Sequence, residues 1–297
     1  MNQKACEIEA LSKVDETSKK LQDNGFDEEA LHCLQLGLFK RRDMFGPKSK
    51  EILLECKRVG QVFNEIALKN INASRFDKAL EYLKHASKIV QKDDKNGKLV
   101  ILQTFAECYR KMDNLAIATR YLKQAVRLQT ELNYRPDERA RSNLNVCANL
   151  SLLGKHEAAL RYAQIAIGIL RHEIRDSACQ RDDKSRSCAQ RKLLEMQAIS
   201  EKYEHDSDSY SLEGDNFVNA DPKYIETLAV AYYNTGVEYE HLGDIKKCYH
   251  FFQQGIEVVH SLGGSHHAIG IALKESSQAV VQKIVRESKG IIKIAQG

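Results

Sequence analysis

Proline and glycine are scarce in this sequence, with three Pro and sixteen Gly in 297 residues. Sandwiches and barrels need many turns, and turns consume both residue types, so an all-β architecture is excluded on composition. Tryptophan is absent and aromatic residues make up only 7%. Good helix formers such as Ala, Leu, Lys, Glu and Gln are abundant, so the composition predicts an all-α protein.

A strong charge of either sign is also missing, since 45 Lys and Arg stand against 41 Asp and Glu. Nucleic-acid-binding domains carry clustered basic charge, so we expect no nucleic-acid partner. No apolar run approaches the 18 or so residues of a membrane span, and the first residues are polar, unlike a secretion signal. The eight cysteines form no CxxC pair and no disulfide framework. We therefore expect a cytoplasmic protein with reduced thiols and no membrane contact.

Catalytic and metal-binding motifs are missing as well. The sequence contains no dinucleotide-binding or phosphate-binding glycine loop, no nucleophile elbow and no HExxH. Asp206 and Asp208 begin like a calcium loop, but Tyr210 and Ser211 stand where a ligand and a glycine are needed. The histidines are not spaced for zinc. We expect no enzyme activity, no catalytic residue, no metal and no cofactor.

What the sequence does contain is a repeated phrase. Residues 76–86 recur as residues 115–125, 156–166 and 245–255, with a weaker copy at 27–37. Each copy has a small residue at one position, and the intervals between these residues are 49, 39, 41 and 89, the last being about two periods. A fixed period of 20 to 50 residues predicts a helical solenoid. The small residues are Ala30, Ala79, Ala118, Ala159 and Cys248.

A second helical pattern precedes each phrase and is clearest in the last copy. There Tyr232, Gly236 and Tyr239 have spacings of four and three, which place them on one face of a helix. Gly243 and Asp244 then form a turn. Small residues are needed where two helices cross closely, so Gly236 and Gly255 join the five small residues above as expected repeat-packing positions.

This pattern resembles the tetratricopeptide repeat (TPR) family, whose W-x2-L-G-x2-Y…A-x3-F pattern is matched here without the Trp. The segments Phe45-Gly46-Pro47-Lys48-Ser49 and 262–267 are similar to the linker of kinesin-light-chain-type repeats, a branch with a longer repeat of about 42 residues. The resemblance implies a right-handed superhelical solenoid of antiparallel helix pairs that binds other proteins.

Five helix pairs and a cap are expected along the chain. The first four pairs occupy residues 4–176, the fifth pair and a C-terminal capping helix occupy 221–288, and 289–297 form a tail. The cap, residues 266–288, is expected to close the stack with its apolar side. Residues 177–220 form an insert of one helix, 186–203, followed by an acidic Ser-rich loop. This insert is either a decayed repeat or a helix that lies along the solenoid and partly fills its groove. The expected pairs are 4–23 with 27–43, 49–70 with 76–92, 97–112 with 115–132, 137–153 with 156–176, and 221–242 with 245–262.

The first helix of each pair is expected to line the concave groove of the solenoid. In kinesin-light-chain-like repeats an Asn on this helix binds the backbone of a peptide, and Asn145 and Asn234 hold that position here. An amide can donate and accept at once, which suits a peptide backbone. Glu65 and Thr104 replace it in two other copies. The remaining groove candidates are Asn64, Gln103, Arg110, Arg141, Tyr233 and His241, with the two arginines suited to an acidic ligand; the alternative is a merely solvated face.

The sequence thus predicts a non-catalytic adaptor or scaffold that binds a peptide or helix of a partner protein in its groove. The resemblance points to a cytoskeletal, cargo or ciliary setting. The main alternative is a permanent structural subunit of a larger complex that uses its convex or edge surface. Two further alternatives are an RNA-binding helical repeat and regulation by the insert, through phosphorylation or occlusion of the groove.

Overall fold

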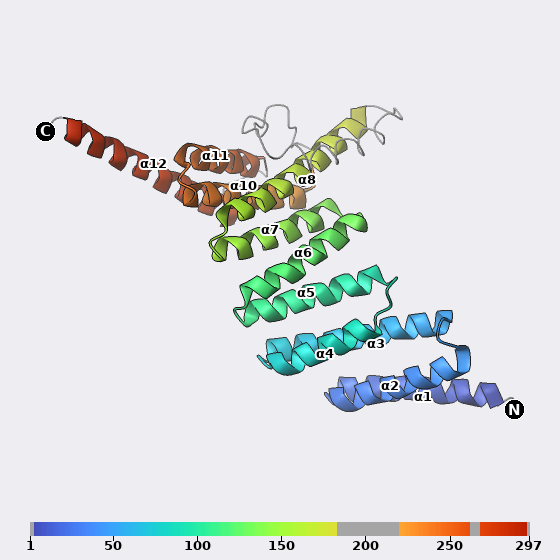
Figure 1. The fold of residues 1–297 in the computed structure, drawn as a ribbon. Coiled ribbons are helices and arrows are strands. Elements are labelled where there is room, and N and C mark those ends of the chain that lie inside the picture. Colours follow the sequence, from blue (N-terminus) through green and yellow to red (C-terminus); the bar gives the residue numbers. More distant parts are fainter. Residues whose placement is uncertain (1–2, 183–219, 262–267, 296–297) are drawn as a thin grey trace. The chain divides into compact units, whose positions relative to one another are not determined.

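The computed structural model describes residues 3–182, 220–261 and 268–295 (Figure 1). Within these ranges every regular element is an α-helix and no strand occurs, which confirms the all-α prediction. The helices are α1 (Gln3–Asp23), α2 (Asp27–Phe45), α3 (Lys50–Asn72), α4 (Phe76–Ile89), α5 (Lys95–Lys111), α6 (Leu115–Glu131), α7 (Pro136–Leu152), α8 (His156–Asp182), α10 (Pro222–His241), α11 (Ile245–His260) and α12 (Ala268–Ala295).

Helix starts follow ordinary capping chemistry. The Ser49 hydroxyl accepts a hydrogen bond from the backbone N–H of Ile52 at the start of α3. The carboxylates of Asp94, Asp221 and Asp244 cap α5, α10 and α11 in the same way. Each such cap satisfies a backbone N–H that has no partner inside the helix.

The turns inside the five helix pairs are built alike. In each turn one residue adopts the left-handed conformation, and the next N–H bonds back to the carbonyl five residues earlier, for example Phe26 to Leu21 at 2.9 Å and Asp244 to Tyr239 at 2.9 Å. This is the Schellman arrangement that ends a helix and reverses the chain. The left-handed residues are Gly25, Ser74, Asp113, Gly154 and Gly243.

The expected repeat-packing residues follow these turns at one fixed place. Each is the fourth residue of the second helix of its pair, and each donates its N–H to the residue just before that helix. All five side chains, those of Ala30, Ala79, Ala118, Ala159 and Cys248, are 0% exposed. A larger side chain at this position would force the two helices of the pair apart.

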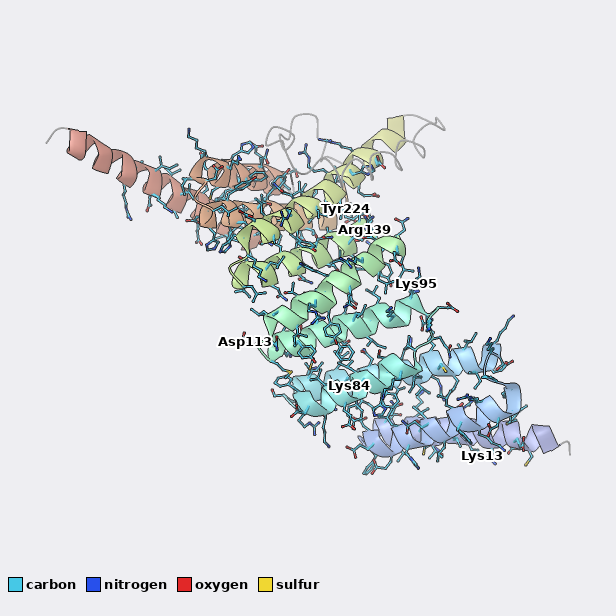
Figure 2. All side chains as sticks on the ribbon, in the orientation of Figure 1. Lys13, Lys84, Lys95, Asp113, Arg139 and Tyr224 are labelled. Atoms are coloured by element: carbon cyan, nitrogen blue, oxygen red, sulfur yellow. The ribbon has the colours of Figure 1, made fainter. Side chains whose placement is uncertain are left out.

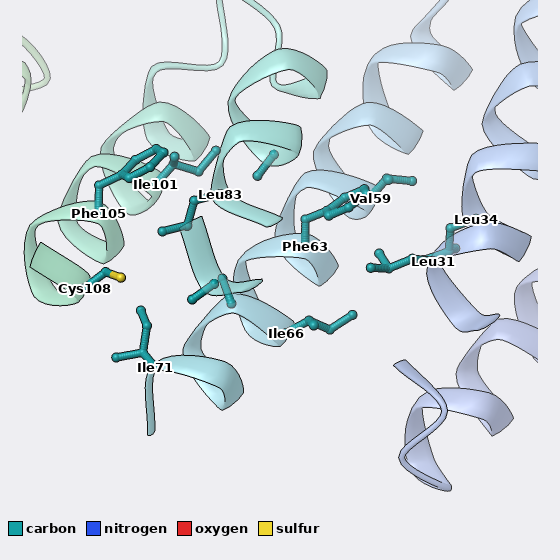
Figure 3. Packing of buried hydrophobic residues seen from close by; sticks show 13 residues of the cluster. Leu31, Leu34, Val59, Phe63, Ile66, Ile71, Leu83, Ile101, Phe105 and Cys108 are labelled. Carbon is teal, nitrogen blue, oxygen red and sulfur yellow. The ribbon is translucent and has the colours of Figure 1, made fainter. Parts of the chain in front are cut away.

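The chain divides into two compact units, Met1–Leu128 and Gln129–Gly297. In the first unit α1 packs against α2, α2 against α3, and α5 against both α3 and α4. Its core runs through several helices, with Leu34 of α2, Phe63 of α3, Leu83 of α4 and Phe105 of α5 among the buried side chains (Figure 3). This core therefore belongs to successive helix pairs together.

A charged cluster joins the first three helices of this unit. Asp15 of α1 accepts hydrogen bonds from Arg41 of α2 and Arg58 of α3, each at 2.5 Å. Arg58 also bonds Glu55 at 2.6 Å, and Glu55 is buried. The two carboxylates and two guanidinium groups neutralise one another, as a buried charge requires.

In the second unit α7 packs against α8 and α10 against α11, and α10 also packs against both α7 and α8. This is the relation that α5 has to α3 and α4 in the first unit. The helix pairs α7–α8 and α10–α11 are therefore direct neighbours.

The insert expected at 177–220 stays a prediction in both of its forms, a decayed repeat or a helix that lies along the solenoid. α8 itself continues to Asp182, six residues beyond the expected end at 176. The expected helix 186–203 and the acidic loop lie outside the described residues.

The expected cap is present as α12, which packs against α11 and α10. Its buried face consists of Gly270, Leu273, Ser277 and Val280. Several apolar residues that were expected to close the stack are exposed instead, namely Ile271, Val281, Ile284 and Val285. The helix also continues to Ala295, through most of the segment expected to be a tail.

Candidate partner-binding surface

Two neighbouring first helices, α7 and α10, present matching faces in the second unit. Counting back from their turn residues Gly154 and Gly243 places Asn145 and Asn234 at equivalent positions. Residues four before, three after and seven after each Asn lie on the same helical face. None of these residues is buried. We call this surface the α7–α10 face: Arg141, Asn145, Ala148, Leu152, Val230, Asn234, Val237 and His241.

The two asparagines of this face keep their amides free. Neither Asn145 nor Asn234 makes a side-chain hydrogen bond within the described part of the chain. Asn143 behaves differently, since its amide donates to the Arg139 carbonyl of its own helix at 2.8 Å. Asn145 and Asn234 therefore offer donors and acceptors to a ligand without first breaking a hydrogen bond.

The neighbours of these asparagines are mostly apolar. Ala148 and Leu152 are exposed on α7, Leu152 to 72%, and Val230 and Val237 are half-buried on α10. An exposed leucine among small apolar groups favours contact with apolar side chains of a partner. The face combines backbone-type hydrogen bonding with apolar contact area.

Both candidate arginines already hold a carboxylate of their own helix. Arg141 donates to the Oδ2 atom of buried Asp137 at 2.5 Å, and Arg110 of the first unit donates to Glu107 at 2.8 Å. An acidic ligand would have to share the guanidinium group with that carboxylate. Because Asp137 is buried and depends on its cationic neighbours, we assign Arg141 a structural role alongside any ligand contact.

Tyr233 and His241 are held in place by aromatic contacts. The Tyr233 ring lies 5.8 Å from the ring of Phe252 on α11, so it belongs to the contact between α10 and α11. The His241 ring stacks at 4.2 Å on His156, the first residue of α8. His241 thus lies on the α7–α10 face but is fixed at its edge.

The first unit lacks the asparagine pair. The equivalent residues are Glu65, which is exposed, and Thr104, which is buried and donates to the Val100 carbonyl at 3.0 Å. Of the other candidates there, Gln103 is exposed, whereas Asn64 is only 5% exposed and its Oδ1 atom has no hydrogen-bond partner in the described residues. Asn64 therefore lies in the packing between helices and not on the surface where we expected it.

Two glycines mark the closest helix contacts of the second unit. A Cβ atom added to Gly236 would lie 2.4 Å from the Phe252 ring, and one added to Gly255 would lie 2.7 Å from Leu273 of α12. Real Cβ contacts are essentially never this short, so a larger residue at either crossing would require the Phe252 or Leu273 side chain to shift.

Charged groups near the starts of α7 and α10 are partly removed from water. Burial lowers the pKa of Arg139, whose Nε atom has no hydrogen-bond partner in the described residues (Figure 2). Burial and the neighbouring carboxylate of Glu173 raise the pKa of Tyr224 (Figure 2). Both side chains are thus half-buried at this end of the second unit.

Two cysteines at repeat positions are unreactive by environment: Cys248, and Cys147, which α7 has where α10 has Gly236. Burial raises the pKa of Cys147 and of Cys248 to about 12, with smaller contributions from Glu238 and Glu240 respectively. The thiolate is the nucleophile, and at these pKa values it is absent at neutral pH. Within the described residues no three His, Cys, Asp or Glu side chains are placed to hold a metal ion.

Solved structures, but not sequences, of known proteins are similar to this chain. No family model and no curated protein matches the sequence. Among solved structures, a STAND signal-transduction ATPase with a TPR sensor from Pyrococcus horikoshii is similar with a TM-score of 0.51 and 13% identity. The match covers 96% of this chain and 35% of that one, so the chain spans about a third of that protein. The fold is that of a tetratricopeptide-type helical repeat.

Two further TPR structures are similar at lower scores. A putative kinesin light chain with TPR-like repeats from Podosopora anserina matches with a TM-score of 0.47 and 13% identity, over 81% of this chain and 93% of that one. The TPR2AB domain of yeast Sti1, in complex with pHSP90, matches with a TM-score of 0.33 and 16% identity, over 80% and 96%. None of the described helices has both the length and the apolar character of a membrane span.

Several residues of the surface were missed by sequence reasoning. Ala148, Leu152, Val230 and Val237 were not singled out. The 89-residue offset that pairs Asn145 with Asn234 also pairs Ala148 with Val237, Leu152 with His241, and Arg141 with Val230. Glu238, one of the few buried carboxylates, was also missed. The register of the repeats could have identified the four apolar residues, but no signal in the sequence indicates that Glu238 is buried.

Proposed function

We propose that this protein is a non-catalytic interaction adaptor and that its α7–α10 face binds an extended segment of a partner protein. The observation that carries the proposal is the pair of unengaged amides, Asn145 and Asn234, at equivalent positions of two adjacent helices. An extended peptide presents unpaired N–H and C=O groups. Each Asn side chain can accept a hydrogen bond from one peptide N–H and donate a hydrogen bond to one peptide C=O.

The surroundings of the two asparagines favour a particular kind of segment. Leu152, Ala148 and Val237 offer apolar contact, and the charged groups at this face are already balanced within the chain. A segment with alternating apolar side chains would gain both hydrogen bonds and burial there. Many modest contacts of this type together give specific binding.

The experiment compares the wild type with the Asn145→Ala plus Asn234→Ala double variant. Peptides selected from a displayed random library on the wild-type protein are measured by calorimetry, and partners in cells are captured by proximity labelling. Loss of two hydrogen bonds of about 1 kcal/mol each predicts an affinity loss of about 10- to 100-fold. The matched control is Gln124→Ala plus Gln282→Ala, which removes two exposed amides outside the α7–α10 face.

The result that overturns the proposal is equal binding by the wild type and the asparagine double variant, or an equal loss in the control variant. If the selected peptides bind the first unit instead, substitutions at Glu65 and Gln103 will weaken them while Asn145 and Asn234 will not matter.

A second candidate function, a permanent subunit of a larger assembly, has one observation in its favour. Leu36 and Phe39 of α2 are exposed to 56% and 66%, on the side of the helix opposite to buried Leu34 and Gly37. Such a pair fits a contact outside the surface of the first helices. Purification from native cells at high salt separates the candidates, because a permanent subunit stays in its complex and an adaptor dissociates.

A further inference from the structure

The last described helix, α12, extends beyond the helix on which it packs. α12 has 28 residues and α11 has 16. At 1.5 Å per residue the difference amounts to about 18 Å of helix. The last buried residue of α12 is Val280, and residues 281–286 are all exposed. Beyond Val280, therefore, no side chain of residues 281–286 is buried, and α10 reaches this stretch through Glu240, whose Oε1 atom lies 3.9 Å from Nζ of Lys283.

The packing seam of α12 nevertheless continues past this point. Leu273, Ser277 and Val280 face α11 with spacings of four and three, and the Ser277 hydroxyl accepts a hydrogen bond from Gln253 of α11 at 2.7 Å. Ile284 follows Val280 at the same spacing but is 39% exposed. In the sequence, Ile291 and Ile294 extend the same register. The apolar period that buries the first half of α12 thus continues at Ile284, where the side chain is exposed.

Adjacent residues widen this seam into a strip. Val281 and Val285 are exposed to 42% and 44%, beside Ile284 on the helix. We call these three residues the α12 strip. Helical residues on one face that are apolar and exposed together mark a surface for another apolar element.

The charge on the same stretch of helix is positive. Lys283 and Arg286 are exposed there, Lys283 in an exposed ion pair with Glu240 of α10 at 3.9 Å. The sequence adds Lys289 and Lys293 against one further acidic residue, Glu287, so the stretch keeps a positive charge. Basic side chains beside an apolar strip attract an acidic partner and repel a second copy of the same helix. A self-dimer through this strip is therefore disfavoured.

The residue types favour a helix over a membrane surface. Val and Ile at spacings of three and four are typical of helix–helix seams. Helices that lie on membranes carry Trp and Phe on their apolar side, and α12 contains no aromatic residue. We propose that the α12 strip docks an acidic amphipathic helix of a partner protein, at a site separate from the α7–α10 face.

The test uses the full chain and a synthetic probe peptide of about three heptads, with Leu at its core positions and Glu at its flanks. The comparison peptide has Lys at the flanks. We expect the Glu peptide to bind the wild type at least about tenfold more tightly than the Lys peptide. Val281→Glu plus Val285→Glu should abolish that binding, whereas Gln282→Glu, which adds a carboxylate to an exposed position off the strip, should leave at least half of the affinity.

Circular dichroism of the double variant should match the wild type, since both valines are exposed. Equal binding of the two peptides, or binding that survives the double substitution, overturns the proposal. So does self-association of the wild type that the double substitution removes, or tighter binding to phosphatidylserine vesicles than to the Glu peptide. The α12 substitutions leave the α7–α10 face unchanged. Peptide binding by the Asn145→Ala plus Asn234→Ala variant therefore tests the proposed function separately from the α12 strip.

Discussion

The Nδ1 atom of His156 lies 2.8 Å from the Oε2 atom of Glu238, and this contact joins two neighbouring helix pairs. His156 is the first residue of α8, and Glu238 lies near the end of α10 with only 2% of its side chain exposed. The equivalent contact in the first unit has the opposite polarity, because Lys69 near the end of α3 pairs with Asp27, the first residue of α2, at 2.8 Å. The same junction thus holds a polar side-chain pair in both units, but only in the second is the acidic group buried.

Removing His156 should therefore destabilise the protein more than removing Lys69. His156→Ala leaves the Glu238 carboxylate buried without its partner, which we expect to lower the free energy of unfolding by about 3 kcal/mol. Lys69→Ala breaks an exposed pair and should lower it by less than about 1 kcal/mol. Urea unfolding at pH 7 measures both.

A double-variant cycle identifies the cause of the His156 effect. In a Glu238→Gln background the buried group is neutral, so His156→Ala should lower the free energy of unfolding by clearly less than in the wild type. An equal loss in both backgrounds would mean that the effect comes from the stacking of His156 on His241 and not from the carboxylate.

Gly236→Ala tests how tightly α10 and α11 cross. The added methyl group would meet the ring of Phe252, which is fully buried. We expect the free energy of unfolding to fall by about 1–3 kcal/mol, as for overpacked cores. In a Phe252→Leu background the same substitution should be less harmful, because the smaller side chain leaves room; an undiminished loss would contradict a steric origin.

The sequence was sufficient for the helices and for the register of the repeats. The fixed position of Ala30, Ala79, Ala118, Ala159 and Cys248 follows from the period alone, because a small residue recurs wherever two helices of a pair cross. The same register predicted where Asn145 and Asn234 lie relative to each other. Local spacing determines these features, and local spacing is what a sequence displays.

Features that depend on how far a neighbouring helix extends could not be predicted. The apolar period of α12 is uniform, so nothing in the sequence distinguishes Val280, which is buried, from Ile284, which is exposed. Asn64 and Glu65 are adjacent in the sequence, and only the packed helices decide that Asn64 is the buried one.

The alkaline stability of the protein should depend on its two repeat-position thiols in the second unit. Burial raises the pKa of Cys147 and Cys248 to about 12 from an ordinary value of 9.0, so the folded state keeps both thiols neutral while the unfolded state releases their protons. Their contribution to stability is complete below pH 9 and is lost as the pH rises from 9 toward 12. Each group should lower the free energy of unfolding by about 1.4 kcal/mol per pH unit in that range.

Urea unfolding at pH 8 and pH 10 checks this expectation. Cys147→Ala plus Cys248→Ala should lose about 3 kcal/mol less than the wild type between the two pH values, because Ala has no proton to release. Cys6→Ala is the matched control, since the Cys6 side chain is exposed and its replacement should leave the pH dependence unchanged. Identical pH dependence of the wild type and the double variant would show that these thiols ionise in the folded state, which is incompatible with the buried positions that the repeat assigns to them.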